Sequence, residues 1–331
     1  MAKLFNGGII ATGSYVPEKV ITNHDLARIV DTSDEWIVTR TGIRERRIAD
    51  PHIATSDLAT IAARRTLESA HLTPQDIDMI IVATVTPDMH FPSTACLVQR
   101  NIGATNASAF DLEAACSGFL YGIIVANQFV ATGFCKNVMV IGAECMSKFV
   151  NWKDRNTCIL FGDGAGAVIV SRVDEGYGFL SQVLGADGSG AELLMLEAGG
   201  SRKPPTFETV EKELHYIHMD GSEVFKFAVQ TMAAMAEEAV QRAGLTKEQV
   251  DFLIPHQANI RIIEAARKKL ELPEDKVYIN LDRYGNMSAA SIPVALDEAV
   301  KQGRIKKGHN IVMVGFGAGL TWGACTIRWA V

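Results

Sequence analysis

The sequence has no excess of basic residues and no long apolar run, and each absence removes a class of protein. Its 32 lysines and arginines are outnumbered by 38 aspartates and glutamates, which gives a net charge of −6. A chain with this balance has no pervasive basic surface to neutralise phosphates, so we expect no nucleic-acid partner. No segment approaches the ~18 consecutive apolar residues that a membrane span needs, so we also expect no membrane partner.

The cysteines lack the spacing of a disulfide framework or a zinc site. There are only six, with no Cys-x-x-Cys pair and no cluster of histidines beside them. The apolar stretch at the N-terminus is short and broken by glycines, so it does not resemble a signal peptide. Both observations favour the reducing cytoplasm. The six positions are Cys96, Cys116, Cys135, Cys145, Cys158 and Cys325.

What the sequence does contain is the pattern of a large α/β protein that repeats itself. At 331 residues the chain is long enough for two domains or one large body. Helical and strand patterns alternate, which indicates an α/β sandwich with parallel strands. Residues 56–88 and 224–259 share one order of features: an amphipathic helix, Leu-Thr, an acidic turn, and an apolar strand that begins after Asp78 or Asp251.

A second pair of segments repeats at the same offset. A helix runs into Asn137 and an apolar strand, and another helix runs into Asn310 and a similar strand. One resemblance between two αβ units is common because the binary pattern is simple, but two in the same register are not. We therefore predict two homologous halves, residues 1–176 and 177–331, packed as one pseudo-symmetric body.

Cys116 is the strongest candidate for a nucleophile. A short strand, 109–112, enters a turn of small residues, and a long apolar helix begins at about Cys116. The unpaired N–H groups and the dipole at a helix start lower the pKa of a thiol, and the thiolate is the nucleophilic form. Taken alone, a cysteine is more often a small core residue, and we expect that of the other five.

Two polar residues in the second half are candidate partners. His256 follows a buried strand, at the end where α/β folds gather catalytic groups. Asn286 lies in a Gly-Asn turn before a helix of small residues. Each also fits an ordinary turn residue. The glycine-rich segment 315–323 lacks the lysine of a phosphate-binding loop, and backbone N–H groups facing an oxyanion are the better interpretation.

Together these segments resemble the thiolase superfamily, and within it the β-ketoacyl-ACP synthase III family, which starts bacterial fatty-acid synthesis. The resemblance covers the whole chain and implies a thiolase-like α/β fold, in which two duplicated βαβ halves form a five-layered αβαβα sandwich. It rests on Ala115-Cys116-Ser117-Gly118, Pro255-His256-Gln257-Ala258-Asn259, Tyr284-Gly285-Asn286, Gly315-Phe316-Gly317-Ala318-Gly319, Asp34-Glu35-Trp36-Ile37, Arg40 to Arg47 and Phe161 to Ala167.

The resemblance implies a decarboxylative Claisen condensation. Cys116 would take an acyl group from acyl-CoA, and malonyl-ACP would then lose CO2 to give an enolate. His256 and Asn286 would donate hydrogen bonds to the developing negative charge, and the N–H groups of Cys116 and Ala318 would form the oxyanion hole. The family usually has glycine where Ala318 stands. Because acyl-CoA is a substrate, the resemblance implies no cofactor and no metal.

The resemblance also implies binding surfaces for the two thioester substrates. The CoA set is Trp36, Arg40, Thr41, Arg155, Gly221, Phe225 and Asn259. The set for the acidic acyl carrier protein is Lys226, Arg261, Lys268 and Lys269. Charged stretches such as these are also found on ordinary solvated faces. Phe91 corresponds to a residue that the family contributes to the acyl pocket across a homodimer interface.

Two alternative functions remain open at this point. One is another Cys-His-Asn condensing enzyme of a specialised pathway, of the polyketide or HMG-CoA-synthase kind. The other is a non-catalytic acyl-binding partner, against which the presence of Cys116, His256 and Asn286 argues. The preferred primer, whether acetyl, straight-chain or branched acyl-CoA, depends on the volume of the pocket and stays undetermined.

Overall fold

The structure is a computed structural model that describes residues 4–331, and its strands form two large sheets and two small ones. The first large sheet has the order β1-β7-β6-β4-β5, and the second has the order β11-β12-β13-β8. The strands are β1 (Gly7–Tyr15), β2 (Val20–Thr22), β3 (Glu45–Arg47), β4 (Met79–Ala83), β5 (Ser108–Leu112), β6 (Asn137–Cys145), β7 (Asp163–Arg172), β8 (Gly178–Ala186), β9 (Leu194–Leu196), β10 (Ile217–Met219), β11 (Phe252–Pro255), β12 (Asn310–Gly317) and β13 (Thr321–Arg328).

Helices cover both faces of each large sheet. The α-helices are α1 (Asn23–Leu26), α2 (Asp34–Thr41), α3 (Thr55–Ala70), α4 (Thr94–Ile102), α5 (Gly118–Ala131), α6 (Arg155–Cys158), α7 (Phe207–Glu211), α8 (Gly221–Arg242), α9 (Ile260–Lys269), α10 (Leu281–Tyr284) and α11 (Ser291–Lys301). The short 3₁₀ turns are η1 (Pro74–Asp76), η2 (Ala115–Ser117), η3 (Met146–Lys148), η4 (Gly188–Leu193), η5 (Lys247–Gln249), η6 (Glu274–Lys276) and η7 (Ser288–Ala290).

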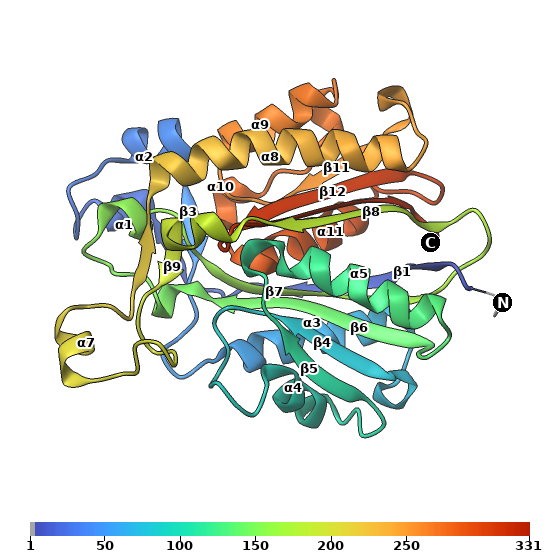
Figure 1. Ribbon diagram of the computed structural model, residues 1–331, viewed down its shortest axis with the longest axis horizontal. Helices are drawn as coiled ribbons and strands as arrows, with labels where there is room; N and C mark the ends of the chain where they lie inside the picture. Colours follow the sequence, from blue (N-terminus) through green and yellow to red (C-terminus); the bar gives the residue numbers. More distant parts are fainter. Residues whose placement is uncertain (1–3) are drawn as a thin grey trace.

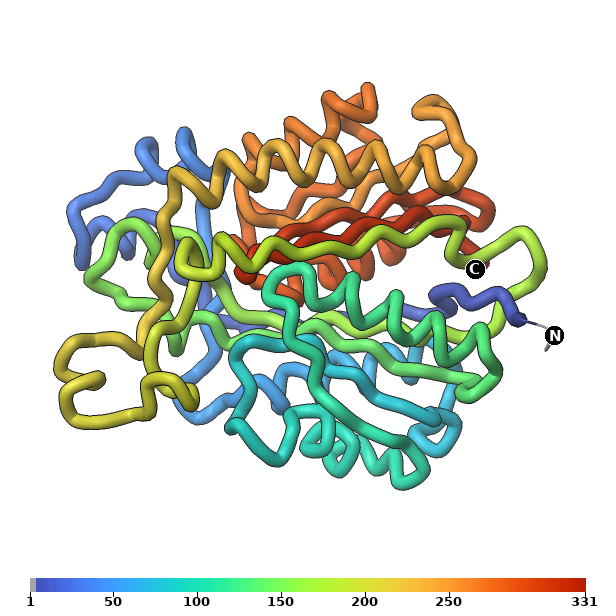
Figure 2. Tube along the Cα trace, viewed as in Figure 1, coloured from blue at the N-terminus to red at the C-terminus, as the bar shows by residue number. Residues whose placement is uncertain are grey.

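The layers follow the order helix, sheet, helix, sheet, helix (Figure 1). Helices α3 and α4 cover the outer face of the first sheet, α5 and α11 lie between the two sheets, and α8 and α9 cover the second sheet. Figure 2 shows that the blue-to-green strands form one sheet and the yellow-green-to-red strands form the other. The predicted five-layered α/β sandwich is therefore confirmed.

The burial of each helix follows from its layer. Helix α5 is apolar around its circumference because it packs between two sheets, and Phe119, Leu120 and Ile123 are fully buried. Helix α11 joins the same core through Ile292 and Leu296. This central core spans both sheets, so burial of apolar surface at α5 and α11 holds the two halves of the chain together.

The sheets are mixed, whereas the sequence pattern predicted parallel strands. Strands β4, β5 and β6 are parallel, and so are β11 and β12. Strand β7 runs antiparallel to β6 and to β1, and β13 runs antiparallel to β12 and to β8. The prediction was wrong for these strands, because the connections β6–β7 and β12–β13 contain no long helix that could return the chain to the starting edge.

The repeated Asp and Asn residues form the same hydrogen bond in both large sheets. Asp78 and Asn137 hold the start of β4 beside the start of β6: the side chain of Asp78 accepts from the N–H of Asn137 at 2.9 Å. Asp251 accepts from the N–H of Asn310 at 2.9 Å, at the start of β11 and β12. The repeat seen in the sequence thus corresponds to a repeated hydrogen-bonded contact.

Four of the five other cysteines are buried, as expected, and they are Cys135, Cys145, Cys158 and Cys325. Cys96 is exposed, so the expectation of a core position is wrong there; it lies on α4, on the outer surface of the first sheet. No helix within residues 4–331 is long and apolar enough to cross a membrane.

Candidate active site

Cys116 lies in the turn η2, immediately before α5, and is buried. Ala115 before it has a φ of 47°, a left-handed conformation that turns the chain sharply out of β5. Gly317 of β12 lies against this turn, where a Cβ atom would come within 2.6 Å of the Cys116 nitrogen. The second half of the chain thus packs directly on the backbone of the nucleophile.

The surroundings of Cys116 favour its neutral thiol form. Burial raises the pKa of Cys116 to about 12, although a hydrogen bond with the Ser288 side chain lowers it. The negative charge of Glu144 raises it further. The expectation of a thiol with a lowered pKa is therefore wrong for the protein without substrate, because the loss of solvent outweighs the lowering effect of the helix start.

His256 directly follows β11 and is buried in the interior. Its Nδ1 lies 2.6 Å from the hydroxyl oxygen of Ser291, and its Nε2 is buried without a hydrogen-bond partner among residues 4–331. Burial lowers the pKa of His256 to about 3, so the imidazole is neutral at pH 7. A neutral ring whose Nδ1 accepts the Ser291 proton carries its own proton on Nε2.

Asn286 is held by the backbone on both sides. Its N–H donates to the carbonyl of Leu160 at 2.8 Å, and its carbonyl accepts from Gly162 at 3.0 Å. Gly285 has a φ of 63°, and a Cβ atom there would lie 2.7 Å from the Leu160 oxygen. The side-chain Oδ1 of Asn286 accepts from the N–H of Ser288 at 2.8 Å, which turns the Nδ2 amide hydrogens away from that turn.

A cavity of about 530 Å³ opens beside Cys116. Most of its wall is apolar, which suits an acyl chain. Its apolar lining includes Val85, Met146, Phe149, Phe161, Leu194, Met195, Leu196 and Ile217, and its polar lining includes Thr84, Thr86, His90, Asp111, Glu113 and Ser288. His256 and Asn286 are not part of this wall. Phe91 follows His90 on the same loop, and 85% of its surface is exposed.

Ala318 lies in the cavity wall on the hairpin between β12 and β13. Thr321 connects this hairpin to the turn of Cys116. Its hydroxyl oxygen lies 3.0 Å from the carbonyl oxygens of both Ala114 and Ala318, and it accepts from Ser117 Oγ at 2.7 Å. The two expected oxyanion donors, on Cys116 and Ala318, are therefore in segments that one hydroxyl group holds together.

The expected CoA residues gather where α2 meets the starts of α8 and α9. The guanidinium groups of Arg40 and Arg155 lie 4.6 and 5.0 Å from the ring centroid of Trp36. Asn259 caps α9, and its amide donates to the carbonyl of Arg40 at 2.9 Å. Thr41 differs from the others because it is buried, and its hydroxyl donates to Ile37 within the helix.

The remaining members of that set lie on α8. Gly221 is the first residue of α8, and Phe225 follows one turn later. The guanidinium of Arg261, at the start of α9, lies 5.1 Å from the ring centroid of Phe225. This contact brings one residue expected at the carrier-protein surface beside one expected to contact CoA.

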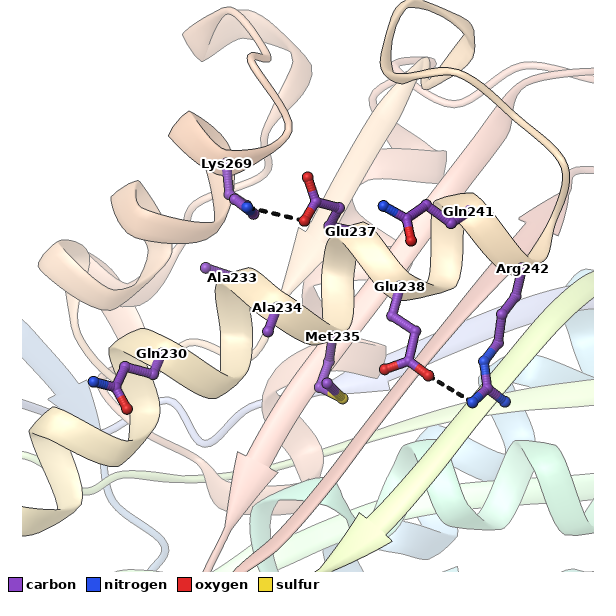
Figure 3. Close-up of a pocket in the computed structure, with 9 residues that line it drawn as sticks. All are labelled: Gln230, Ala233, Ala234, Met235, Glu237, Glu238, Gln241, Arg242 and Lys269. Atoms are coloured by element: carbon purple, nitrogen blue, oxygen red, sulfur yellow. Dashed lines mark ion pairs between the residues drawn. The ribbon is translucent and has the colours of Figure 1, made fainter.

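The four expected carrier-protein cations fall into two groups along α9. Arg261 lies over Phe225, the residue before Lys226 in α8, whereas Lys268 and Lys269 lie at the other end of α9, about 12 Å away at 1.5 Å per residue. Lys226 pairs with Glu223 at 2.7 Å. Lys269 pairs with Glu237 at 2.9 Å across the shallow groove beside α8, which Figure 3 shows.

Sequence reasoning missed the residues that support Cys116 and Asn286. Ser288 contacts both, and Glu144 of β6 accepts from the Ser288 hydroxyl at 2.9 Å. The sequence contained one signal for Glu144, an acidic residue inside an otherwise apolar strand. It contained none for Thr321 or for Ser288, because small polar residues before a helix are ordinary turn residues.

Comparisons with known proteins agree on one family. Its two models, described as 3-Oxoacyl-[acyl-carrier-protein (ACP)] synthase III and the C-terminal part of the same protein, match residues 110–188 and 240–329. The chain is 64% identical over 330 residues to the Beta-ketoacyl-[acyl-carrier-protein] synthase III of Caldanaerobacter subterraneus subsp. tengcongensis, covering 100% of both chains.

Solved structures give the same result. The chain is 49% identical to the 3-oxoacyl-[acyl-carrier-protein] synthase III of Aquifex aeolicus, with a TM-score of 0.91 over 98% of this chain and 100% of that one. It is 35% identical to the priming beta-ketosynthase of the R1128 polyketide pathway, with a TM-score of 0.92 over 99% and 98%. The higher identities belong to the synthases III rather than to the enzyme of a specialised pathway.

Proposed function

Because the chain belongs to the 3-oxoacyl-[acyl-carrier-protein] synthase III family, we propose that it transfers an acyl group from acyl-CoA to Cys116 and condenses it with malonyl-ACP. The chain is an acyltransferase that carries out the initiating condensation of fatty-acid synthesis. The observation that supports the proposed residue roles is the packing of three separate segments: the turn of Cys116 packs on β12 and on the turn that follows Asn286, and the His256 ring packs on Phe316 of β12.

In the first half-reaction Cys116 attacks the acyl carbonyl and CoA leaves. The carbonyl oxygen becomes negative in the tetrahedral intermediate, and the N–H groups of Cys116 and Ala318 stabilise it. A backbone donor serves this purpose whatever its side chain, so alanine at 318 is compatible with the role. The acyl chain enters the apolar cavity beside Cys116.

In the second half-reaction malonyl-ACP loses CO2, and the enolate attacks the acyl-Cys116 carbonyl. His256 and Asn286 donate hydrogen bonds to the enolate oxygen. A neutral His256 suits this role in the tautomer whose Nδ1 accepts from Ser291, because Nε2 then carries a proton to donate. The position of Asn286 suits it also, because Ser288 already occupies its Oδ1 and leaves the amide hydrogens for the substrate.

The substrate surfaces follow from the same family. Trp36 and Arg155 bind the adenine of CoA between them, with Arg40, Gly221, Phe225 and Asn259 along the path to Cys116. Thr41 supports that path from inside, through its helix contact. The acidic carrier protein docks on Lys226, Arg261, Lys268 and Lys269.

The working form proposed here is a homodimer in the cytoplasm. The exposed ring of Phe91, beside the cavity, then completes the acyl pocket of the partner subunit. This side chain is 85% exposed and is therefore available for a contact of this kind. The reaction needs no bound metal or cofactor, since both activated groups arrive as thioesters.

The test follows acylation and decarboxylation separately. Protein mixed with isotopically labelled acyl-CoA gains label at Cys116 alone, and Cys116→Ser loses it. His256→Ala and Asn286→Ala keep the acylation but lose malonyl-ACP decarboxylation by about 100-fold or more, as expected for loss of an oxyanion donor. Label on Cys116→Ser at the normal rate, or equal loss of both steps in the His256 and Asn286 variants, contradicts these roles.

A further inference from the structure

Arg46 is a buried cation that the proposed chemistry does not use. It lies in the short strand β3, and its side chain is fully buried. Within residues 4–331 it forms no ion pair, its hydrogen bonds go to neutral oxygens, and its Nε has no partner. Burial lowers the pKa of Arg46 to about 10, so the guanidinium is still charged at pH 7. A buried charge without a countercharge is costly to keep, which points to a function at this place.

The guanidinium of Arg46 joins segments that are distant in the sequence. Its Nη1 donates to the carbonyl of Ile21 at 3.1 Å and to Oδ1 of Asn23 at 3.0 Å. Its Nη2 donates to the carbonyl of Ile159 at 2.8 Å. Ile21 belongs to β2 and Asn23 begins α1, whereas Ile159 directly follows α6. Because the donors of a guanidinium point in fixed directions, these contacts hold the segments in one arrangement.

Ile159 begins the segment that holds the backbone of Asn286. The next residue, Leu160, accepts from the N–H of Asn286 at 2.8 Å, and Gly162 donates to the carbonyl of Asn286 at 3.0 Å. These two hydrogen bonds fix the residue on both sides of its Cα atom. The segment 159–162 therefore sets where the backbone of Asn286 lies, and the guanidinium holds the first carbonyl of that segment.

Arg46 also packs directly against the turn that carries Asn286. A Cβ atom placed on Gly162 would lie 3.2 Å from the Cβ atom of Arg46, and one placed on Gly285 would lie 3.5 Å from it. Gly285 directly precedes Asn286 in the chain. Strand β3 also packs along α10, which ends at Tyr284. The backbone around Asn286 thus contacts Arg46 through packing as well as through the hydrogen-bonded segment.

The other end of the guanidinium is held by residues that are themselves paired. Asn23 is fully buried, and its amide donates to Asp34 Oδ1 at 2.9 Å and to the carbonyl of Ile43 at 2.8 Å. Asp34 is the first residue of α2, the helix that carries three of the expected CoA residues. Since Asn23 is fixed at both of its amide contacts, its Oδ1 keeps Nη1 in place, and Nη2 stays directed at Ile159.

The proposed role of Asn286 requires such a fixed position. A hydrogen-bond donor stabilises an enolate best when it is already in place before the negative charge develops. A displacement of about 1 Å can cost about 100-fold in rate. The side chain of Asn286 is oriented by Ser288, and its backbone is placed by segment 159–162. A residue that fixes this segment therefore affects the rate without touching the substrate.

We propose that Arg46 is a positioning residue for Asn286, and that it holds segment 159–162 so that the amide hydrogens of Asn286 are in place for the enolate. This inference rests on the proposed function, in which Asn286 serves the decarboxylation of malonyl-ACP. Arg46 is not part of the cavity wall. None of its hydrogen bonds within residues 4–331 reaches the turn of Cys116, so acylation does not depend on it.

The experiment measures the two half-reactions separately in Arg46→Met. Rapid quench and intact-protein mass follow acylation at saturating acyl-CoA, and release of labelled CO2 from malonyl-ACP follows decarboxylation. The kcat of decarboxylation falls by about 10-fold or more, as displacement of a donor predicts. The KM for malonyl-ACP and the acylation rate stay within about 2-fold of the native values, because no substrate contact is removed. Equal loss of both steps, or native decarboxylation, overturns the proposal.

A double-mutant cycle separates positioning from a general loss of structure. If Arg46 acts through Asn286, Arg46→Met has no further effect on decarboxylation in protein that already carries Asn286→Ala. The double variant and Asn286→Ala then have the same rate within about 2-fold. A merely structural role would instead lower the rate of Asn286→Ala by the same factor as that of the native protein. Such independent effects overturn the proposal.

Arg44→Met is the matched control, because Arg44 is an exposed arginine directly before β3. Its backbone N–H donates to Asp282 at 2.9 Å, and the substitution keeps that bond. Both half-reactions should proceed at native rates in this variant. If Arg44→Met loses decarboxylation as Arg46→Met does, the effect does not come from the buried guanidinium, and the proposal is wrong.

The outcomes also separate this inference from the function on which it rests. If Asn286→Ala keeps native decarboxylation, the proposed role of Asn286 is wrong. If Asn286→Ala loses decarboxylation and Arg46→Met keeps it, only the positioning role is wrong. Should Arg46→Met fail to fold, as a thermal melt would show, Arg46→Lys keeps the charge without the planar fork. Selective loss of decarboxylation in Arg46→Lys then supports the proposal, and native decarboxylation overturns it.

Discussion

The turns η2 and η7 have nearly the same backbone but different chemistry. Each follows the equivalent point of its half and leads into a central helix, and its first residue is left-handed: Ala115 has a φ of 47° and Ser288 a φ of 45°. The next residue is Cys116 in the first turn and Ala289 in the second. The two halves thus share a scaffold, and the nucleophile is placed in only one of them.

Each turn packs against a strand of the other half. A glycine makes both contacts possible: Gly317 of β12 lies against Cys116, and Gly142 of β6 lies against Ala289. Two residues beyond Gly142 stands Glu144, which faces Ser288. Because each turn packs on a strand of the other half, the site forms only where the two halves meet. Every candidate chemical group therefore depends on contacts between the halves.

The largest effect is expected from filling these two contacts. A Cβ atom at Gly317 would lie 2.6 Å from the Cys116 nitrogen, and one at Gly142 would lie 2.2 Å from the Ala289 oxygen. Gly317→Ala should displace Cys116 and lower acylation by 100-fold or more. Gly142→Ala should displace the second turn and lower decarboxylation more than acylation. Each should cost about 1–3 kcal/mol of stability through overpacking.

Gly188→Ala is the matched control, since no atom lies within 4 Å of a Cβ placed there. Rates of both half-reactions and urea unfolding are measured for all three variants. If Gly317→Ala and Gly142→Ala impair the same step equally, Cys116 in the first turn and Asn286 before the second do not have the separate roles proposed for acylation and decarboxylation.

A second contrast between the halves concerns pH. Burial raises the pKa of Glu144 from 4.5 to about 7, so this group contributes stability that is complete below pH 4.5 and lost as the pH rises to about 7. Burial lowers the pKa of His256 from 6.5 to about 3, so this group contributes stability that is complete above pH 6.5 and lost as the pH falls. The two buried groups therefore act in opposite directions.

Urea unfolding across pH 4.5 to 8 measures this contrast. Relative to the native protein, Glu144→Gln should gain on the order of 3 kcal/mol between pH 4.5 and 8, because the native carboxyl must ionise in the interior. In the native protein the free energy of unfolding falls below pH 6.5 as His256 takes up a proton on unfolding. In His256→Ala this fall should be absent. Glu68→Gln, on the exposed side of α3, serves as the control. If the free energy of unfolding depended on pH in the same way in all variants, Glu144 and His256 would not have these opposite effects on stability.

The sequence allowed prediction of the residues whose neighbours along the chain are distinctive. Cys116, His256 and Asn286 stand in short motifs beside strand ends, and the repeat indicated two similar halves. The five layers followed from the family resemblance. The antiparallel directions of β7 and β13 could not be predicted, because an apolar strand has the same sequence pattern in either direction.

What the sequence did not reveal depends on contacts between distant segments. Ser288 and Glu144 are far apart in the chain, and nothing near either one indicates the hydrogen bond between them. The prediction of a lowered pKa for Cys116 was wrong for a related reason. The helix start is visible in the sequence and lowers the pKa, but the burial that raises it to about 12 comes from both halves packing together.

The smallest effect on the reaction is expected at the opposite edge of the sheets, where the halves are most alike. Asp78 accepts from the N–H groups of both Lys136 and Asn137, at 2.6 and 2.9 Å, whereas Asp251 accepts from Asn310 alone among residues 4–331, at 2.9 Å. The two contacts serve the same purpose, since each holds the starts of two parallel strands together. They differ by one hydrogen bond.

Asp78→Ala should therefore destabilise the protein more than Asp251→Ala, by about 3–6 against about 1.5–3 kcal/mol, because each hydrogen bond to a charged group contributes about 1.5–3 kcal/mol. Urea unfolding at pH 7 measures the difference, and each variant is the control for the other. Acylation should be unchanged in both, because neither aspartate reaches the cavity. Equal losses of stability would mean that the extra bond to Lys136 adds nothing, and that the two halves are as alike in energy at this edge as they are in sequence.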